Sequence, residues 1–329
     1  MGNLPDISEA ISIMQRAVRL TFDGHPHMPS RLNTLGNALQ SRFERAGDVS
    51  DLSEGISAHQ RAVQLTPDGH PHMPSRLNDL GISYLHRSRR TGDISDLSET
   101  ISIHQQVVRF TPDDHPDMPI HLNNLGSSFQ SRFERTGDIS DLSEAVLILR
   151  RAVQLTSDGR PDLPGLLGNF GLSLRRRFQH TGNVSDLSEA IPAQQRAVQL
   201  IPDGHPDMPM WLNSLGNSLR SRFEHTGDMS DLLEAISIQH RAVQLTPEGH
   251  PDMPGRLSNL AISFNYRFEH TSNPADLLET ITTQQRAIQL TPDCHPAMLE
   301  LLSNLGNLFR IRFECTGDVT DLSEAISIH

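Results

Sequence analysis

Asparagine is the residue type whose spacing in this sequence most clearly suggests binding chemistry. One series recurs in steps that are multiples of 45 residues, and members of a second series stand four residues later, one helical turn away. The first series is Asn33, Asn78, Asn123 and Asn213, and the second is Asn37, Asn217 and Asn307. An asparagine amide offers a donor and an acceptor, which suits the main chain of a bound peptide. Hydrogen bonds across neighbouring helices, or simple exposure to water, remain as alternatives.

Arginines form a second candidate series, at a position whose residue type varies along the chain. The residues at this position are Gln40, Leu85, Gln130, Arg175, Arg220, Asn265 and Arg310. Arg175, Arg220 and Arg310 could read an acidic or phosphorylated peptide through bidentate contacts. A solvated helix surface is the more common reason for such residues. A different row, Arg42 to Arg312 in steps of 45, never varies and precedes aspartates of the following turn. We expect a structural role for that row.

Other residue types give no sign of catalysis or metal binding. Histidine recurs once per 45 residues in a turn, as His25, His70, His115, His205, His250 and His295. Metal sites need several converging donors, so we expect a turn role instead. All 28 basic residues are arginine, which excludes a P-loop lysine and Schiff-base chemistry. Cys294 and Cys315 lack a nucleophile motif. We therefore expect no enzymatic activity, no cofactor and no metal.

The elements that position these residues follow from a period of 45 residues. A D-[LI]-[SL]-E segment opens each unit, and the units begin at residues 6, 51, 96, 141, 186, 231 and 276, with a partial eighth from 321. Such a period indicates a repeat architecture. We expect residues 1–329 to form one repeat domain.

Each unit has the pattern of a helix pair. Asp51-Leu52-Ser53-Glu54 has the form of a capping box at the start of one helix. A second helix should start near Pro74 and end at Gly92, which suits a left-handed cap. Stacking such pairs buries the apolar stripes that one pair leaves exposed. The expected fold is all-α, an α-solenoid of stacked antiparallel helix pairs with fourteen full helices and a stub.

The unit resembles the tetratricopeptide repeat (TPR). The residues Leu77, Leu80, Gly81 and Tyr84 match the first-helix pattern, and Thr100, Val107 and Pro112 match the second. The usual unit has about 34 residues, and the extra residues fall in two places. The L-N-N-L-G form at 122–126 resembles kinesin light chain repeats. The R-F-E-R-T-G-D form is similar to arrays in fungal and bacterial proteins that carry a CHAT domain.

The resemblance implies that the asparagines line a concave groove and hold the backbone of an extended peptide. The chain would then be a non-catalytic protein–protein interaction scaffold with a protein or peptide partner. Its two cysteines are too few for a disulfide framework, so we expect it in the cytoplasm. An alternative is a structural, self-associating segment that positions a CHAT-type or other effector domain, with self-association through uncapped ends. The net charge of -12 argues against nucleic-acid and membrane partners.

Overall fold

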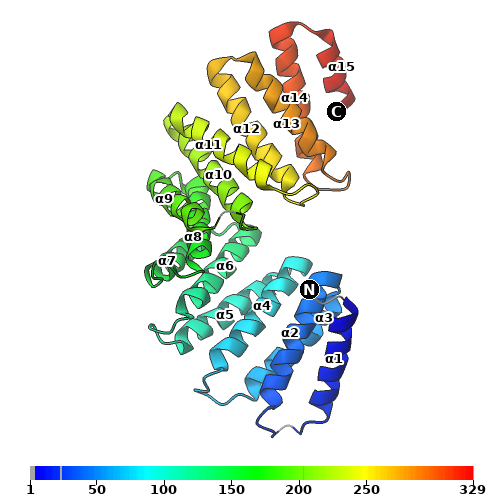
Figure 1. Ribbon diagram of the computed structural model, residues 1–329, viewed down its shortest axis with the longest axis vertical. Coiled ribbons are helices and arrows are strands. Elements are labelled where there is room, and N and C mark those ends of the chain that lie inside the picture. Colours follow the sequence, from blue (N-terminus) through cyan, green and yellow to red (C-terminus); the bar gives the residue numbers. More distant parts are fainter. Residues whose placement is uncertain (1–3, 23, 203, 329) are drawn as a thin grey trace. The chain divides into compact units, whose positions relative to one another are not determined.

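The computed structural model describes residues 4–22, 24–202 and 204–328. Fifteen helices, with no strand, follow one another along these residues (Figure 1). Seven helices of 19 residues carry even numbers: α2 (Met28–Ala46), α4 (Met73–Thr91), α6 (Met118–Thr136), α8 (Leu163–Thr181), α10 (Met208–Thr226), α12 (Met253–Thr271) and α14 (Met298–Thr316). The odd-numbered helices are α1 (Leu4–Arg19), α3 (Val49–Gln64), α5 (Ile94–Phe110), α7 (Ile139–Gln154), α9 (Val184–Leu200), α11 (Met229–Leu245), α13 (Pro274–Gln289) and α15 (Val319–Ile328).

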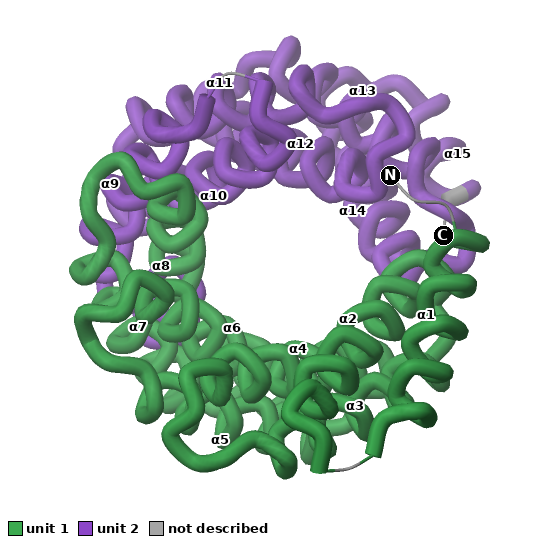
Figure 2. Tube along the Cα trace, turned by 60° about the horizontal axis from the view of Figure 1, so that its bottom comes forward, with its two compact units in different colours: residues 1–173 green, residues 174–329 purple. Residues whose placement is uncertain are grey.

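The chain divides into two compact units, residues 1–173 and residues 174–329, with the boundary inside α8 (Figure 2). In the first unit, consecutive helices from α1 to α7 pack against one another, and α2 also touches α4. In the second unit, helices α9 to α15 pack in the same way, and α10 also touches α12. The prediction of an all-α solenoid of stacked helix pairs is confirmed. One continuous domain over residues 1–329 stays a prediction.

The ends of the even-numbered helices follow from local sequence. Proline occupies the first turn of α4, where its missing N–H leaves no helical hydrogen bond unmade. Gly92 ends the same helix with φ 80°, and its N–H donates to the carbonyl of Ser88 at 2.7 Å. A left-handed φ suits glycine because it has no Cβ. The predicted start near Pro74 and the predicted glycine cap are both confirmed.

The start of the odd-numbered helices corrects the sequence prediction. Helix α3 begins at Val49, and its N-cap is Asp48, whose carboxylate accepts a hydrogen bond from the N–H of Ser50 at 2.9 Å. The predicted capping box at Asp51 is therefore wrong by three residues. Asp51 lies in the first turn, 3% exposed, and its carboxylate is bound by Arg42 of the preceding helix. Asp51 is already the third residue of the helix, so its side chain is available to bind Arg42 and does not cap the helix.

Glycine lets an even-numbered helix approach the following odd-numbered helix closely. Gly126 of α6 faces α7, and a Cβ built on it would lie 2.7 Å from Cγ of Leu149. Real side chains do not pack at that distance, so only glycine fits without a shift of the neighbour. The apolar core beside this contact contains Ile101, Leu125, Phe129 and Ala145, all buried. The spacing between α6 and α7 thus depends on the absence of a side chain at Gly126.

Candidate functional site

The invariant arginines bind aspartates inside each helical hairpin and form no surface site. The pairs are Arg42–Asp51, Arg87–Asp96, Arg132–Asp141, Arg177–Asp186, Arg222–Asp231, Arg267–Asp276 and Arg312–Asp321. In Arg132, Nε donates to the carboxylate of Asp141 at 2.8 Å, and the guanidinium lies 5.4 Å from the centre of the Phe129 ring. The hydrogen bond to Asp141 raises the pKa of Arg132. The expected structural role of this row is confirmed.

The recurrent histidines hold the turns before the even-numbered helices. Nδ1 of His115 accepts a hydrogen bond from the N–H of Asp117 at 3.1 Å, and the other five make the same contact two residues ahead. Within the described ranges, no cluster of three His, Cys, Asp or Glu side chains could hold a metal ion. Over the same residues, no helix has both the length and the apolar composition needed to cross a bilayer.

The asparagines form hydrogen bonds between neighbouring even-numbered helices, at an offset of 46 residues. Nδ2 of Asn124 donates to Oδ1 of Asn78 at 2.8 Å, and Nδ2 of Asn169 donates to Oδ1 of Asn123 at 2.9 Å. In the second unit, Nδ2 of Asn259 donates to Oδ1 of Asn213 at 3.2 Å. We call these three contacts the asparagine ladder. They correspond to the cross-helix alternative that the sequence left open.

The asparagine that accepts each ladder hydrogen bond uses its amide oxygen but not its amide nitrogen. Oδ1 of Asn78, Asn123 and Asn213 is occupied, whereas their Nδ2 groups have no partner among the described residues. All three side chains are partly exposed. Each therefore keeps one donor for a bound main chain while its oxygen ties two helices together.

The remaining asparagines differ in how many of their amide groups already form hydrogen bonds. Both groups of Asn37 are used, by His59 at 3.0 Å and by Asp79 at 3.2 Å. Nδ2 of Asn33 donates to Asp79 at 2.7 Å. Asn217 is 9% exposed and accepts from Gln239, whereas Asn307 is exposed without a partner in the described chain. Asn33, Asn37 and Asn217 are thus less suited to binding than the ladder acceptors.

Two of the three variable arginines pair with a glutamate of their own helix. Nη1 of Arg220 donates to Glu224 at 3.1 Å, and Arg310 pairs in the same way with Glu314, each one turn further on. Burial, together with the charges of Arg176 and Arg220, lowers the pKa of Arg175 to about 10. Arg175 therefore stays charged at neutral pH. An acidic ligand would have to displace the glutamates at the other two positions.

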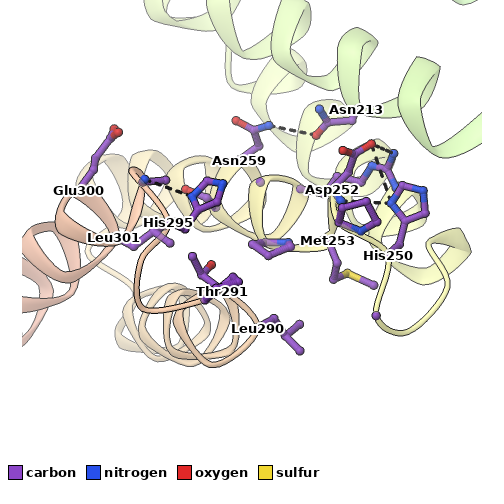
Figure 3. Close-up of a pocket in the computed structure, with 18 of the residues that line it drawn as sticks. Asn213, His250, Asp252, Met253, Asn259, Leu290, Thr291, His295, Glu300 and Leu301 are labelled. Carbon is purple, nitrogen blue, oxygen red and sulfur yellow. Dashed lines mark hydrogen bonds and ion pairs between the residues drawn. The ribbon is translucent and has the colours of Figure 1, made fainter. Parts of the chain in front are cut away.

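A cavity of about 790 Å³ opens in the second unit, between α10, α12, the first turn of α14 and the loops before α12 and α14 (Figure 3). Its wall is mainly apolar and includes Met210, Met253 and Leu301. Met253 and Leu301 are buried, whereas Met210 is 42% exposed at the rim. The Asn213–Asn259 rung of the ladder borders the cavity (Figure 3). Cavities of this size are typical of ligand sites.

The wall of the cavity includes a residue without a side chain, Gly255. Gly255 occupies the position that holds Met210 and Ile120 in other units, and a Cβ built on it would meet nothing within 4 Å. Three residues of the cavity wall, Met210, Gly255 and Glu300, belong to a second variable row of the sequence, from which specificity in the groove was expected. The members of this variable row are Ser30, Ser75, Ile120, Gly165, Met210, Gly255 and Glu300. The sequence does not show that neighbouring members of the row surround one cavity.

Comparison with known proteins supports the repeat assignment. Residues 210–252 match a family model described as a tetratricopeptide repeat. The C-terminal part of a TPR repeat-containing protein from Cytophaga hutchinsonii is similar over 90% of this chain and 95% of its own, with a TM-score of 0.54 and 10% identity. The Cut9–Hcn1 hetero-tetramer of the APC/C is similar over 91% of this chain and 50% of its own, with a TM-score of 0.52 and 14% identity.

A further solved structure also consists of TPR-like repeats. The nearly identical TPR-like repeats of a Podosopora anserina protein assigned as a kinesin light chain are 17% identical, with a TM-score of 0.47, over 65% of this chain and 97% of theirs. None of the curated proteins matches the chain. The resemblance to TPR-like repeats is confirmed. The similarity to CHAT-domain arrays stays a prediction.

Proposed function

We propose that this array of TPR-like repeats is a non-catalytic scaffold for protein–protein interaction, and that its even-numbered helices bind an extended peptide. The observation that carries the proposal is the unused Nδ2 donor on Asn78, Asn123 and Asn213. These donors recur at one position of the repeat, and the carbonyls of an extended chain are acceptors for them. Each amide is also held in place by its ladder bond, which lowers the entropic cost of binding.

The proposed partner is a protein or peptide. A net charge of -12 opposes approach to nucleic acid and to anionic lipid, because both carry dense negative charge. The same charge favours basic partners at long range. Placement in the cytoplasm is part of this proposal, since the two cysteines are unpaired and exposed.

Asparagine-to-aspartate changes separate binding from structure. In a double variant with Asn78→Asp and Asn123→Asp, the carboxylates still accept the ladder bonds from Asn124 and Asn169 but no longer offer a donor. We expect binding to an array of random 12-residue peptides to fall by about tenfold or more, because each lost hydrogen bond costs roughly 1 kcal/mol. The thermal midpoint should stay nearly unchanged. Gln105→Glu combined with Gln106→Glu adds the same two charges at exposed positions of α5 as the control.

The opposite change tests the structural alternative. Asn124→Ser removes a ladder donor but leaves Nδ2 of Asn78 free, so it should lower the thermal midpoint and spare binding. Peptide binding that survives the double aspartate variant would contradict the proposal. Concentration-dependent association in sedimentation, without peptide binding, would favour the self-associating segment instead.

A further inference from the structure

We infer that the cavity between α10, α12 and α14 takes a large apolar side chain of the bound peptide, and that this side chain neighbours a lysine or arginine. This inference rests on the proposed function, because it names the chemistry that the scaffold would recognise at one place. It adds a specificity site to an otherwise sequence-independent contact with the main chain.

The shape of the cavity fits an apolar anchor. Its interior is formed by the buried side chains of Met253 and Leu301, and its rim by Met210 and Leu290, which are 42% and 40% exposed. Side chains that are exposed in the free protein gain free energy when an apolar group covers them. Methionine also adapts its shape to different apolar partners, so the cavity suits leucine, isoleucine, methionine or phenylalanine.

The charges around the cavity favour a cation beside that anchor. Glu300 is exposed and has no ion-pair partner among the described residues. Asp252, on the opposite side of the cavity (Figure 3), also lines it. The one arginine in the wall, Arg256, is 6% exposed and donates to Asp252 and to Thr246. Because Arg256 is already neutralised by Asp252, the net charge offered to a ligand is that of Glu300.

Two histidines stand at the mouth and are held by the turns before α12 and α14. His250 and His295 each accept a backbone hydrogen bond at Nδ1, from Asp252 at 3.1 Å and from Ala297 at 3.2 Å. Nδ1 of His250 also lies 3.9 Å from the carboxylate of Asp252. These contacts fix the orientation of both rings at the edge of the cavity.

The main chain of the peptide can be held at the same time. Nδ2 of Asn213 is unused and belongs to the rung that borders the cavity (Figure 3). A peptide that hydrogen-bonds this donor lies within reach of the cavity. The amide would fix the backbone, the cavity would select the apolar residue, and Glu300 would select the charge beside it.

Methyl NMR of the full chain tests the inference. The chain has ten methionines, of which Met210 and Met253 line the cavity. The probes are three hexapeptides with the cores Ser-Leu-Arg-Ser, Ser-Leu-Glu-Ser and Ser-Ser-Arg-Ser. We expect the Leu-Arg peptide to shift the Met210 and Met253 methyl signals, with an affinity at least about threefold above that of the Leu-Glu peptide, the size of an exposed ion pair.

Variants borrowed from other repeats sharpen the test. Gly255→Ile places in the cavity the residue that α6 carries at the same position, Ile120. It should lower the affinity for the Leu-Arg peptide about tenfold or more, because the apolar side chain of the peptide can no longer be buried. Ser75→Ile makes the equivalent change in α4 and should leave the affinity unchanged. Glu300→Arg should reverse the preference toward the Leu-Glu peptide.

Each outcome decides between the two proposals. Loss of the methyl shifts in Gly255→Ile, with the preference reversed in Glu300→Arg, supports the inference. Equal binding of the Leu-Arg and Leu-Glu peptides overturns the charge assignment. Peptide binding that responds to the double variant Asn78→Asp and Asn123→Asp, but not to Gly255→Ile, overturns the cavity and leaves the proposed function intact. Absence of all peptide binding overturns both.

Discussion

The imidazole of His104 packs directly on the backbone of Gly81: a Cβ built on this glycine would lie 2.6 Å from Nε2 of the ring. Nδ1 of His104 lies 2.9 Å from Oγ of Ser128, and that hydroxyl donates to the carbonyl of Asn124 at 2.7 Å. Since the hydroxyl proton is used, Nδ1 carries the ring proton. Nε2 then points at the glycine without a hydrogen-bond partner.

This geometry makes the fold sensitive to acid. Burial and the nearby His121 lower the pKa of His104 to about 4. Between pH 6.5 and 4 the unfolded chain binds a proton at this residue that the folded chain does not, so stability falls as the pH falls. A shift of this size corresponds to about 3 kcal/mol once the pH is below both pKa values. Urea midpoints at pH 7.5, 5.5 and 4.5 measure the loss.

The residue at the equivalent position of the next repeat suggests a control variant for His104. Leu149 occupies the same repeat position in α7, where it packs on Gly126. His104→Leu should therefore fold, and its urea midpoint should fall less between pH 7.5 and 4.5 than that of the unmodified chain. An identical fall in both proteins would assign the acid sensitivity to other groups.

The contact between Gly126 and Leu149 predicts a cost for a single methyl group. Gly126→Ala places a Cβ 2.7 Å from Cγ of Leu149, and overpacking of this kind costs about 1 to 3 kcal/mol. Gly165→Ala in α8 is the matched control, because nothing lies within 4 Å of its Cβ. The control should stabilise by up to about 1 kcal/mol, as helix propensity predicts. Thermal midpoints of the two variants should move in opposite directions.

The pair of Arg132 and Asp141 contributes to stability within one hairpin. Asp141 is 1% exposed and binds Nε of Arg132 at 2.8 Å and its Nη2 as well. Asp141→Asn removes the charge and one acceptor, and we expect a loss of about 2 kcal/mol, less than for a fully buried pair because the arginine is partly exposed. Asp276→Asn should cost less, since Nε of Arg267 has no partner and the second oxygen of Asp276 accepts only from the uncharged hydroxyl of Thr271, at 3.2 Å. Equal losses would show that the second arginine–aspartate hydrogen bond adds no more than the Thr271 contact.

Ser272 occupies a position that glycine holds elsewhere. Its φ is 52°, in the left-handed region, where the equivalent Gly227 has φ 73°. A residue with a Cβ pays about 1 to 2 kcal/mol there, partly offset by the larger entropy of unfolded glycine. Ser272→Gly should raise stability by about 0.5 to 1 kcal/mol, and Gly227→Ser should lower it by a similar amount. A lower thermal midpoint for Ser272→Gly would contradict this reading.

The parts of the fold that the sequence predicted depend on local chemistry. The end of α4 at Gly92 and its start near Pro74 follow from residues next to one another in the chain. The cap at Asp48 was misplaced because Asp51 and Glu54 present the same pattern three residues later. In the structure Asp48 accepts from the N–H of Ser50, whereas Asp51 is bound by Arg42 of the preceding helix.

The site was harder to predict because it depends on the register between helices. Asn78 and Asn124 are hydrogen-bonded although they lie 46 residues apart. The 45-residue period alone does not predict that the partner lies one residue beyond the equivalent position. The cavity requires α10, α12 and α14 to place Met210, Gly255 and Glu300 around one volume. The composition of the variable row was visible in the sequence, but its arrangement in space was not.

Each arginine–aspartate pair joins residues nine positions apart, well inside the 45-residue period. One 45-residue unit is encoded by 135 nucleotides. Gain or loss of such a block, wherever it begins within the unit, would therefore leave an intact arginine–aspartate pair at the junction. The variable row, in contrast, would acquire new neighbours with each such event. Recombination between units can thus create or erase a cavity like the one at Gly255 without a single substitution in the framework.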